Sequence, residues 1–313
     1  MDGVVGGPPC QGFSYIGKMN PSDERNALIG RFFRFVACAE PAFFVMENVL
    51  GILAPDFRFI LDQGLEELNG RYNILGPLIF DTSDFGAATK RKRAIFVGYL
   101  PDRVDPIAES DLTVFKVSGH VTVEEAIADL PSPSKAARDC DGQYWAKYGR
   151  DPSLGVKGAY ARRAREAPPP NLGSKHIREN CRMNLVSGFQ PTRHTHEVLK
   201  RFISVAPGMK DETSKCPRLD WSRQCPTLRA GTGKERGSYQ AIRPIHPEEN
   251  RVISVREAAR LQGFPDWFQF HPTIWHSFRM IGNSVSPYLS NSILRSIACK
   301  LYAVKNSKQL VYG

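Results

Sequence analysis

A cysteine in a stiff turn is the residue of this sequence best placed for nucleophilic chemistry. Cys10 stands in the stretch GGPPCQGFS (6–14), directly after a short apolar run. Glycine permits close backbone approach and proline fixes φ, so this stretch predicts a bent loop that aims one side chain. Backbone N–H groups in such a loop favour a thiolate over a thiol, whose free pKa is about 8.5, and Cys10 is therefore a candidate nucleophile. The alternative is a buried structural cysteine.

A carboxylate follows a second apolar run. Glu47 comes at the end of AFFVM (42–46) and is followed by Asn48. Because it stands at the end of an apolar run, as Cys10 does, Glu47 is a candidate site residue. The alternative is a turn or helix-capping carboxylate with a structural role.

The elements that would position these side chains alternate along the first third of the chain. Strands are expected at 3–7, 42–49, 72–81 and 93–100, and helices at about 26–40 and 56–69. This alternation predicts an α/β fold with a parallel sheet, whose ligands bind beyond the carboxyl ends of the strands. Cys10 and Glu47 both fall at such ends, and this shared placement is more informative than either residue alone.

The remainder of the chain predicts irregular structure and three helices. Residues 131–175 hold little periodicity, and a helix is expected at 194–204. SVREAARLQGFP (254–265) predicts a helix with Ser254 and Glu257 as a capping box and Gly263 at its end. A final amphipathic helix begins near Pro287.

Composition favours a protein that meets a polyanion. The 313 residues carry a net charge of +10, and residues 151–250 contain 18 Lys and Arg against 10 Asp and Glu. A solvated basic surface is the alternative to a polyanion-binding face. The seven cysteines show no CxxC spacing, so neither a disulfide framework nor a metal site is predicted. Because no signal peptide and no membrane-length apolar run are found, a cytoplasmic or nuclear protein is expected.

Five motifs follow one another in an order typical of one family: GGPPCQGFS (6–14), MENV (46–49), FGAATKRKRAIFVGY (85–99), SVREAARLQGFPDWF (254–268) and IGNSVSP (281–287). The sequence resembles the C5-cytosine-specific DNA methyltransferases of bacterial and phage restriction-modification systems. The resemblance implies the C-terminal part of an S-adenosylmethionine-dependent methyltransferase sheet (Rossmann-like), with a smaller irregular target-recognition domain. Residues 1–100 would be catalytic, 101–250 target-recognising, and 251–313 a return to the catalytic domain.

The resemblance also implies a reaction and its residues. Cys10 would attack C6 of a cytosine flipped out of duplex DNA, Glu47 would contact N3, and Asn48 would hold the base or the loop. Arg93 would contact O2 with Arg91 beside it, although a nuclear-localisation signal or solvated patch is the alternative for KRKR (90–93). The family usually has Pro-Gln where this chain has Ala88-Thr89. This departure bears on the geometry of the loop before the arginines more than on the arginines themselves.

Residues toward the methyl donor and the DNA follow from the same resemblance. The residues that would line the S-adenosylmethionine pocket are Pro9, Leu28, Asn283 and Ser284. The residues that would contact DNA are Gln11, Ser14 and Lys18 in a loop that closes on DNA, and Arg229 and Lys234 in PTLRAGTGKERGSYQ (226–240), a reading loop. Lysine and arginine there would make binding salt-dependent.

The family's FxGxGG donor motif has no counterpart in this sequence. We expect a fragment of a longer protein, with a split enzyme completed by a second polypeptide or a degenerate relic as alternatives. The run at 3–7 would then be an exposed apolar sheet edge. Two other functions stay open: a non-catalytic DNA-binding protein, and a tRNA cytosine-5 methyltransferase, whose Cys-Phe-Thr element is not seen. A bacterial protein close to the nucleoid is expected.

Overall fold

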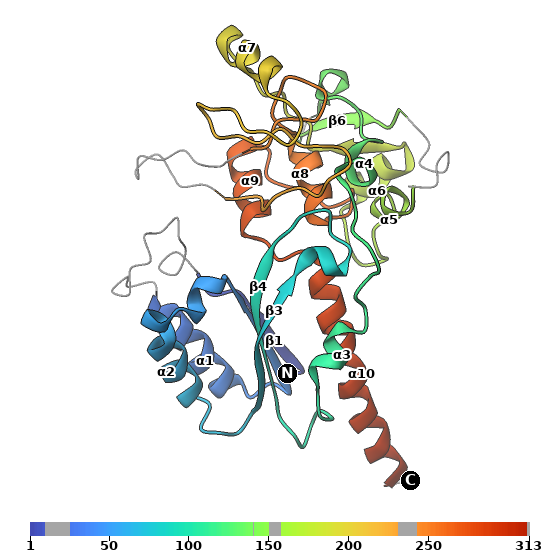
Figure 1. The fold of residues 1–313 in the computed structure, drawn as a ribbon. Coiled ribbons are helices and arrows are strands. Elements are labelled where there is room, and N and C mark those ends of the chain that lie inside the picture. Colours follow the sequence, from blue (N-terminus) through green and yellow to red (C-terminus); the bar gives the residue numbers. More distant parts are fainter. Residues whose placement is uncertain (10–25, 140, 150–157, 231–242, 312–313) are drawn as a thin grey trace. The chain divides into compact units, whose positions relative to one another are not determined.

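The computed structural model describes residues 1–9, 26–139, 141–149, 158–230 and 243–311, with side chains as far as residue 301. These residues form two compact units (Figure 1). Unit 1 comprises Met1–Phe85, Arg91–Val117 and Leu289–Gly313, and unit 2 comprises Gly86–Lys90 and Ser118–Tyr288. The functional segments expected at 1–100, 101–250 and 251–313 stay predictions.

Unit 1 is built on a four-stranded sheet in the order β1-β2-β4-β3. The strands are β1 (Gly3–Gly6), β2 (Phe43–Asn48), β3 (Asn73–Asp81) and β4 (Lys92–Tyr99). β1 pairs parallel with β2, whereas β4 pairs antiparallel with both β2 and β3. The expectation of a wholly parallel sheet is therefore wrong for β4. Residues 82–91 join β3 to β4 directly, and this connection is shorter than the roughly a dozen residues or more that a parallel crossover needs.

One face of this sheet is covered by α1 (Ala27–Ala39) and α2 (Arg58–Glu66), which lie on the same side of the strands in Figure 1. Both helices form in the predicted ranges. Phe33 and Val36 of α1 pack into one core with Phe44 and Met46 of β2. The rings of Phe33 and Phe44 meet edge to face with centroids 5.8 Å apart. Because side chains alternate along a strand, this packing turns Glu47 to the opposite face.

On that opposite face lie α3 (Glu109–Thr113) and α10 (Pro287–Val311), to the right of the strands in Figure 1. The predicted start of the last helix at Pro287 is confirmed. Ser296 Oγ of α10 donates to the backbone oxygen of Asp111 at 2.7 Å, and Lys300 Nζ lies 3.3 Å from the Asp111 carboxylate. These contacts hold α10 against α3.

Unit 2 combines short helices with a three-stranded antiparallel sheet in the order β5-β6-β7. Its strands are β5 (Ala137–Arg138), β6 (Tyr144–Lys147) and β7 (Leu185–Ser187). Its helices are α4 (Val123–Ile127), α5 (Ala159–Ala164), α6 (Lys175–Arg182), α7 (His196–Ser204), α8 (Val255–Gln262) and α9 (Ile274–Asn283). Short 3-10 turns of the two units are η3 (Leu50–Leu53), η4 (Pro55–Phe57), η5 (Thr82–Phe85) and η6 (Pro133–Lys135).

The central helix of unit 2 is α8, all of whose residues are buried. The predicted capping box is confirmed, since Glu257 N donates to Ser254 Oγ at 3.2 Å and Ser254 N donates to Glu257 Oε2 at 2.6 Å. Gly263 ends the helix with φ +98°, as predicted. Arg260 is fully buried and binds Asp266 with two nitrogens, at 2.5 and 2.6 Å. A charge on this helix is thus buried because it is paired.

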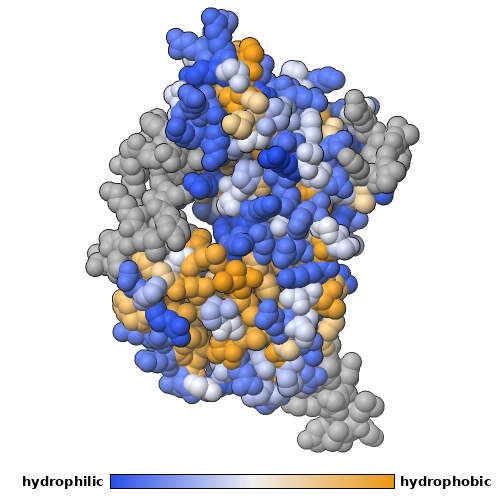
Figure 2. Space-filling view, viewed as in Figure 1, coloured by the Kyte–Doolittle hydropathy of each residue, from blue (hydrophilic) through white to orange (hydrophobic). Residues whose placement is uncertain are grey.

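On the face that Figure 2 shows, the two units differ in polarity. Figure 2 shows apolar surface gathered over unit 1 and mainly hydrophilic surface over unit 2. β1 is an edge strand and Val5 is 60% exposed, which confirms the expected apolar edge. Among the described residues, no helix is long and apolar enough to cross a membrane.

Candidate active site

The loop after β1 and the end of β2 meet at the carboxyl ends of these two strands. Because these strands run parallel, their carboxyl ends lie side by side. A side chain on Gly7 would place its Cβ 3.2 Å from Glu47 Oε2, so the glycine lets the loop approach the carboxylate closely. Asn48 Nδ2 donates to the backbone oxygen of Pro8 at 3.2 Å, and Asn48 Oδ1 accepts from Val49 N at 2.9 Å. Asn48, which is buried, therefore ties this loop to β2.

Glu47 forms a buried ion pair across the sheet. Arg93 lies at the start of β4, and its Nε is 2.6 Å from Glu47 Oε1. The two side chains are 10% exposed for Arg93 and 15% for Glu47. Arg93 Nη1 also donates to the backbone oxygen of Lys92 at 2.7 Å, which fixes the plane of the guanidinium. The pair is therefore largely shielded from solvent, and its guanidinium is held in place by a second bond.

Burial sets the proton affinity of Glu47. Loss of hydration raises the pKa of Glu47, and the charges of Arg93 and Arg91 oppose this effect without cancelling it. A carboxyl with a raised pKa holds its proton closer to neutrality than a solvated one. Glu47 can therefore donate a proton, or share one, with a group that enters this edge of the sheet.

Arg91 is buried beside this pair, and a residue that sequence reasoning missed positions its backbone. Asp81 ends β3, and its Oδ1 accepts from Arg91 N at 3.0 Å and from Ser83 N at 3.2 Å. The backbone oxygen of Arg91 accepts from Thr82 N at 3.1 Å. Asp81 therefore shapes the turn that brings both arginines to β4. The signal in the sequence is an aspartate before Thr-Ser at a strand end, a typical turn-forming pattern.

The residues expected to line the methyl-donor pocket divide between the two units. Pro9 is exposed after β1, and Leu28 is half-buried near the start of α1 in unit 1. Asn283 is exposed at the end of α9 in unit 2. Ser284 follows it, donates from Oγ to Ile281 O at 2.8 Å, and caps the helix.

Of the residues expected to contact DNA, the structure describes Arg229, which is exposed in unit 2. Cys10 and the other four expected DNA contacts lie outside the described residues; these are Gln11, Ser14, Lys18 and Lys234.

Three side chains of unit 2 have atoms spaced as metal ligands, within 4.8 Å of one another: Asp139, Asp141 and His176. His176 Nε2 lies 3.2 Å from Asp139 Oδ2 and 3.6 Å from Asp141 Oδ2. Gln269 Nε2 donates to Asp141 at 2.8 Å, and Asn180 Nδ2 lies 3.1 Å from His176 Nε2. These contacts account for the group as a polar junction between α6 and the turn after β5. Sequence reasoning did not find it because His176 is distant in the chain from the two aspartates.

A family model described as C-5 cytosine-specific DNA methylase matches residues 1–299 of the chain. The chain belongs to this family. The type II methyltransferase M.XorII of Xanthomonas oryzae pv. oryzae is 38% identical over 328 residues, which cover 100% of this methylase and 72% of that protein. M.DdeI of Desulfomicrobium norvegicum, also a type II methyltransferase, is 31% identical over 95% of this chain and 72% of its own.

Solved structures agree on the fold of this methylase. A crystal structure of an E. coli prophage protein described as a DNA modification methyltransferase matches with a TM-score of 0.81 and 37% identity. The match covers 96% of this chain and 80% of that one. S. pombe Dnmt2 shares the fold at 16% identity and a TM-score of 0.53. The α/β methyltransferase fold and the activity of a DNA (cytosine-5-)-methyltransferase are thus shown, and the family implies S-adenosylmethionine as methyl donor.

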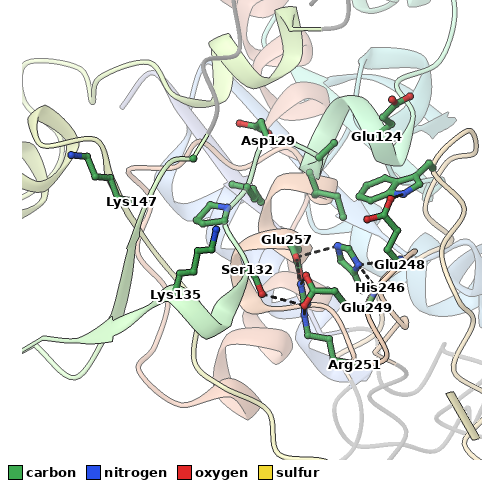
Figure 3. A pocket seen from close by; sticks show the side chains of 16 residues that line it. Glu124, Asp129, Ser132, Lys135, Lys147, His246, Glu248, Glu249, Arg251 and Glu257 are labelled. Carbon is green, nitrogen blue, oxygen red and sulfur yellow. Dashed lines mark hydrogen bonds and ion pairs between the residues drawn. The ribbon is translucent and has the colours of Figure 1, made fainter. Parts of the chain in front are cut away.

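A cleft of about 480 Å³ in unit 2 of the methylase is lined by charged groups that bind one another (Figure 3). Arg251 Nη1 and Nη2 each donate to Glu257 at 2.8 Å, and its Nε donates to Glu249 at 2.8 Å. His246 Nδ1 accepts the backbone N–H groups of Glu248 and Glu249 at 3.2 and 3.0 Å. None of the predicted catalytic or donor residues that the structure describes lines this cleft. Its network holds the preceding loop against α8.

Proposed function

We propose that this methylase transfers a methyl group from S-adenosylmethionine to C5 of a cytosine flipped out of duplex DNA, through a covalent bond between Cys10 and C6 of the base. The observation that supports this most is the buried pair of Glu47 and Arg93 at the edge of the sheet where the loop after β1 passes. Cys10 is the next residue of that loop after Pro9.

The chemistry needs a nucleophile because cytosine C5 alone is too weak to take a methyl group. The Cys10 thiolate adds to C6, and the electron pair of the C5–C6 bond becomes an enamine that attacks the methyl carbon. S-adenosylmethionine, when bound, supplies that methyl group on a sulfonium sulfur, which leaves with the bonding electrons. A base then removes the C5 proton, and the thiolate leaves C6, which restores the aromatic ring.

Glu47 and Arg93 would stabilise the adduct from the side of the ring that carries N3 and O2. Glu47 holds a proton readily because burial raises its pKa, so it protonates or hydrogen bonds to N3 as charge develops there. Arg93 orients Glu47 through Nε and faces O2, with Arg91 beside it. Asn48 holds the loop that carries the nucleophile through Pro8.

The residues proposed to contact S-adenosylmethionine, two in each unit, would offer it apolar surface and hydrogen-bonding groups. Leu28 offers apolar surface on α1, and the exposed amide of Asn283 can both donate and accept hydrogen bonds. Ser284 Oγ already donates to Ile281 O, so its hydroxyl oxygen would act toward the methyl donor as an acceptor. Pro9 would contact the donor from the loop that carries Cys10.

Double-stranded DNA is the proposed substrate, bound through cationic and polar side chains. Arg229 and Lys234 would meet the duplex from the recognition region, and Gln11, Ser14 and Lys18 from the loop after Cys10. A net charge of +10 supports phosphate contacts and salt-dependent binding. The similarity to type II methyltransferases supports a bacterial restriction-modification role, with the cytoplasm as its site of action.

The experiment that tests this proposal is covalent trapping. The purified chain is mixed with duplex oligonucleotides that carry 5-fluorocytosine, with and without S-adenosylmethionine, and conjugates are resolved on a denaturing gel. Fluorine at C5 cannot leave as a proton does, so the thiolate stays bonded to C6. A donor-dependent conjugate that is absent in Cys10→Ser is expected. DNA binding without a conjugate would instead favour a non-catalytic binding protein or one half of a split enzyme. Adding the other half would distinguish these two, because only a split enzyme would then form the conjugate.

A further inference from the structure

The segment 225–230 of unit 2 is anchored in the core by two buried residues and carries Arg229 at the surface. Cys225 is 0% exposed and Leu228 is 2% exposed, and both pack in one cluster with Phe278 and Ile281 of α9. Arg229 is exposed directly after the buried Leu228. The position of this cationic side chain therefore depends on how the buried part of the segment is held.

The first end of this segment is fixed to residues 88–90 by backbone bonds. Cys225 N donates to Ala88 O at 2.8 Å, and Lys90 N donates to Cys225 O at 2.9 Å. Thr227 Oγ1 donates to Lys90 O at 2.6 Å. Thr89, which is fully buried, donates from Oγ1 to a backbone oxygen of α8 at 2.8 Å. Ala88 and Thr89 stand where the family usually has Pro-Gln. In this chain Ala88 binds the backbone of Cys225, and Thr89 binds α8.

The second end of the segment lies against Gly282 of α9. A Cβ on Gly282 would lie 2.3 Å from Ala230 N and 2.6 Å from both Ala230 Cα and the carbonyl carbon of Arg229. All three atoms belong to the backbone, so no side-chain rotation can relieve the overlap. A glycine is therefore what permits α9 to touch the chain here.

The chain also returns to the same face of α9 after residue 242. The guanidinium of Arg243 lies over the ring of Phe278, with its carbon 4.8 Å from the ring centroid. Phe278 and Gly282 are four residues apart on α9 and so share one face of the helix. One turn of α9 thus contacts the chain at Arg229–Ala230 and again at Arg243.

We propose that Gly282 is a positioning residue for DNA binding, because its missing side chain sets the place of residues 225–230 and so the place of Arg229. This inference deepens the proposed function, since it rests on Arg229 as a DNA contact. On this proposal, α9 contacts the chain before the expected reading loop at Arg229–Ala230 and after it at Arg243.

The test compares Gly282→Ala with Gly149→Ala in the full chain, since a Cβ on Gly149 meets no atom of the described residues within 4 Å. The first readout is independent of DNA: labelling of Cys225 by N-ethylmaleimide, followed by peptide mass spectrometry. Cys225 should react slowly in the parent chain because burial raises its pKa to about 12. At least tenfold faster labelling is expected in Gly282→Ala, with Cys216, buried elsewhere in unit 2, unchanged as an internal control. Unchanged Cys225 labelling would overturn the inference.

The second readout is affinity for a mixed-sequence duplex oligonucleotide. Gly282→Ala and Arg229→Ala should each weaken binding about tenfold, and the double variant should bind no more weakly than the worse single one. Independent, multiplying effects would overturn the inference, as would weaker S-adenosylmethionine binding with DNA affinity unchanged, because that result would place the effect at Asn283. No effect of Arg229→Ala would refute its DNA contact, and with it the proposed role of Gly282 in DNA binding, whatever the labelling of Cys225 shows.

A milder variant covers the case in which Gly282→Ala does not fold. Thr227→Val removes the hydrogen bond to Lys90 O from an exposed, nearly isosteric side chain. It should shift Cys225 labelling and DNA affinity in the same directions by smaller factors, about threefold. Parent-like values in both readouts would contradict the inference.

Discussion

Replacement of Glu47 by glutamine separates the catalytic proton from the shape of the site. The amide has the size of the carboxyl, and its oxygen can still accept from Arg93 Nε, which lies 2.6 Å from Oε1. The amide cannot donate a titratable proton to N3 of the base. Loss of a general acid costs about 10²–10⁴-fold in rate. This corresponds to roughly 2.7–5.4 kcal/mol in the barrier at about 1.36 kcal/mol per tenfold.

The same substitution should not destabilise the fold above neutral pH. Since burial raises the pKa of Glu47, the folded protein holds this proton more tightly than the unfolded chain does. Stability is therefore lost as pH rises from the ordinary value of 4.5 through the raised pKa, and glutamine escapes this loss. The difference in Tm between Glu47→Gln and the parent should therefore increase from pH 4.5 to pH 8. A plot of this difference against pH measures the stability that the parent loses through Glu47.

The assay is single-turnover transfer of a labelled methyl group to unmethylated DNA at saturating protein, with thermal melts over the same pH range. Glu66→Gln is the matched control, because it makes the same change at an exposed position of α2. DNA affinity should stay within a factor of about three of the parent while the rate falls. A rate above one third of the parent, or a Tm at pH 8 several degrees lower, would refute the reasoning.

Three further predictions follow from buried polar groups. Arg260→Met should lower the free energy of unfolding in urea by about 3–5 kcal/mol, since it leaves the Asp266 and Asp129 carboxylates without this cation; a loss below 1 kcal/mol would contradict the role of the network. Burial lowers the pKa of His246 in the folded protein. The contribution of the neutral imidazole to folding stability is therefore fully present above about pH 6.5 and is lost as the pH falls below that value. His246→Gln should therefore flatten the fall of Tm between pH 6.5 and pH 5, and an unchanged slope would show that other groups dominate. Asn48→Ala should slow methyl transfer about tenfold or more with a stability loss of about 1–3 kcal/mol, because a buried bond to the loop of the nucleophile is lost; parent-like single-turnover rates would contradict this.

The sequence by itself determined the local elements and the candidate chemistry. β1, β2, α1 and the capping box of α8 form where period and turn residues predict, because these signals act between residues close in the chain. Five ordered motifs were enough to indicate the family and to select Cys10 and Glu47. Whether those two side chains act as proposed stays a prediction for the trapping experiment.

Tertiary structure decided how distant residues pair. The reversal of β4 depends on a short connection and on pairing with strands far along the chain, which periodicity does not report. The ion pair of Glu47 with Arg93 exists because antiparallel pairing of β2 with β4 brings the two together. The need for glycine at 282 arises because the backbone at 229–230 occupies the space of its Cβ. These three features depend on contacts between segments that are far apart in the sequence. Local sequence patterns do not report such contacts, because they form only when the chain packs.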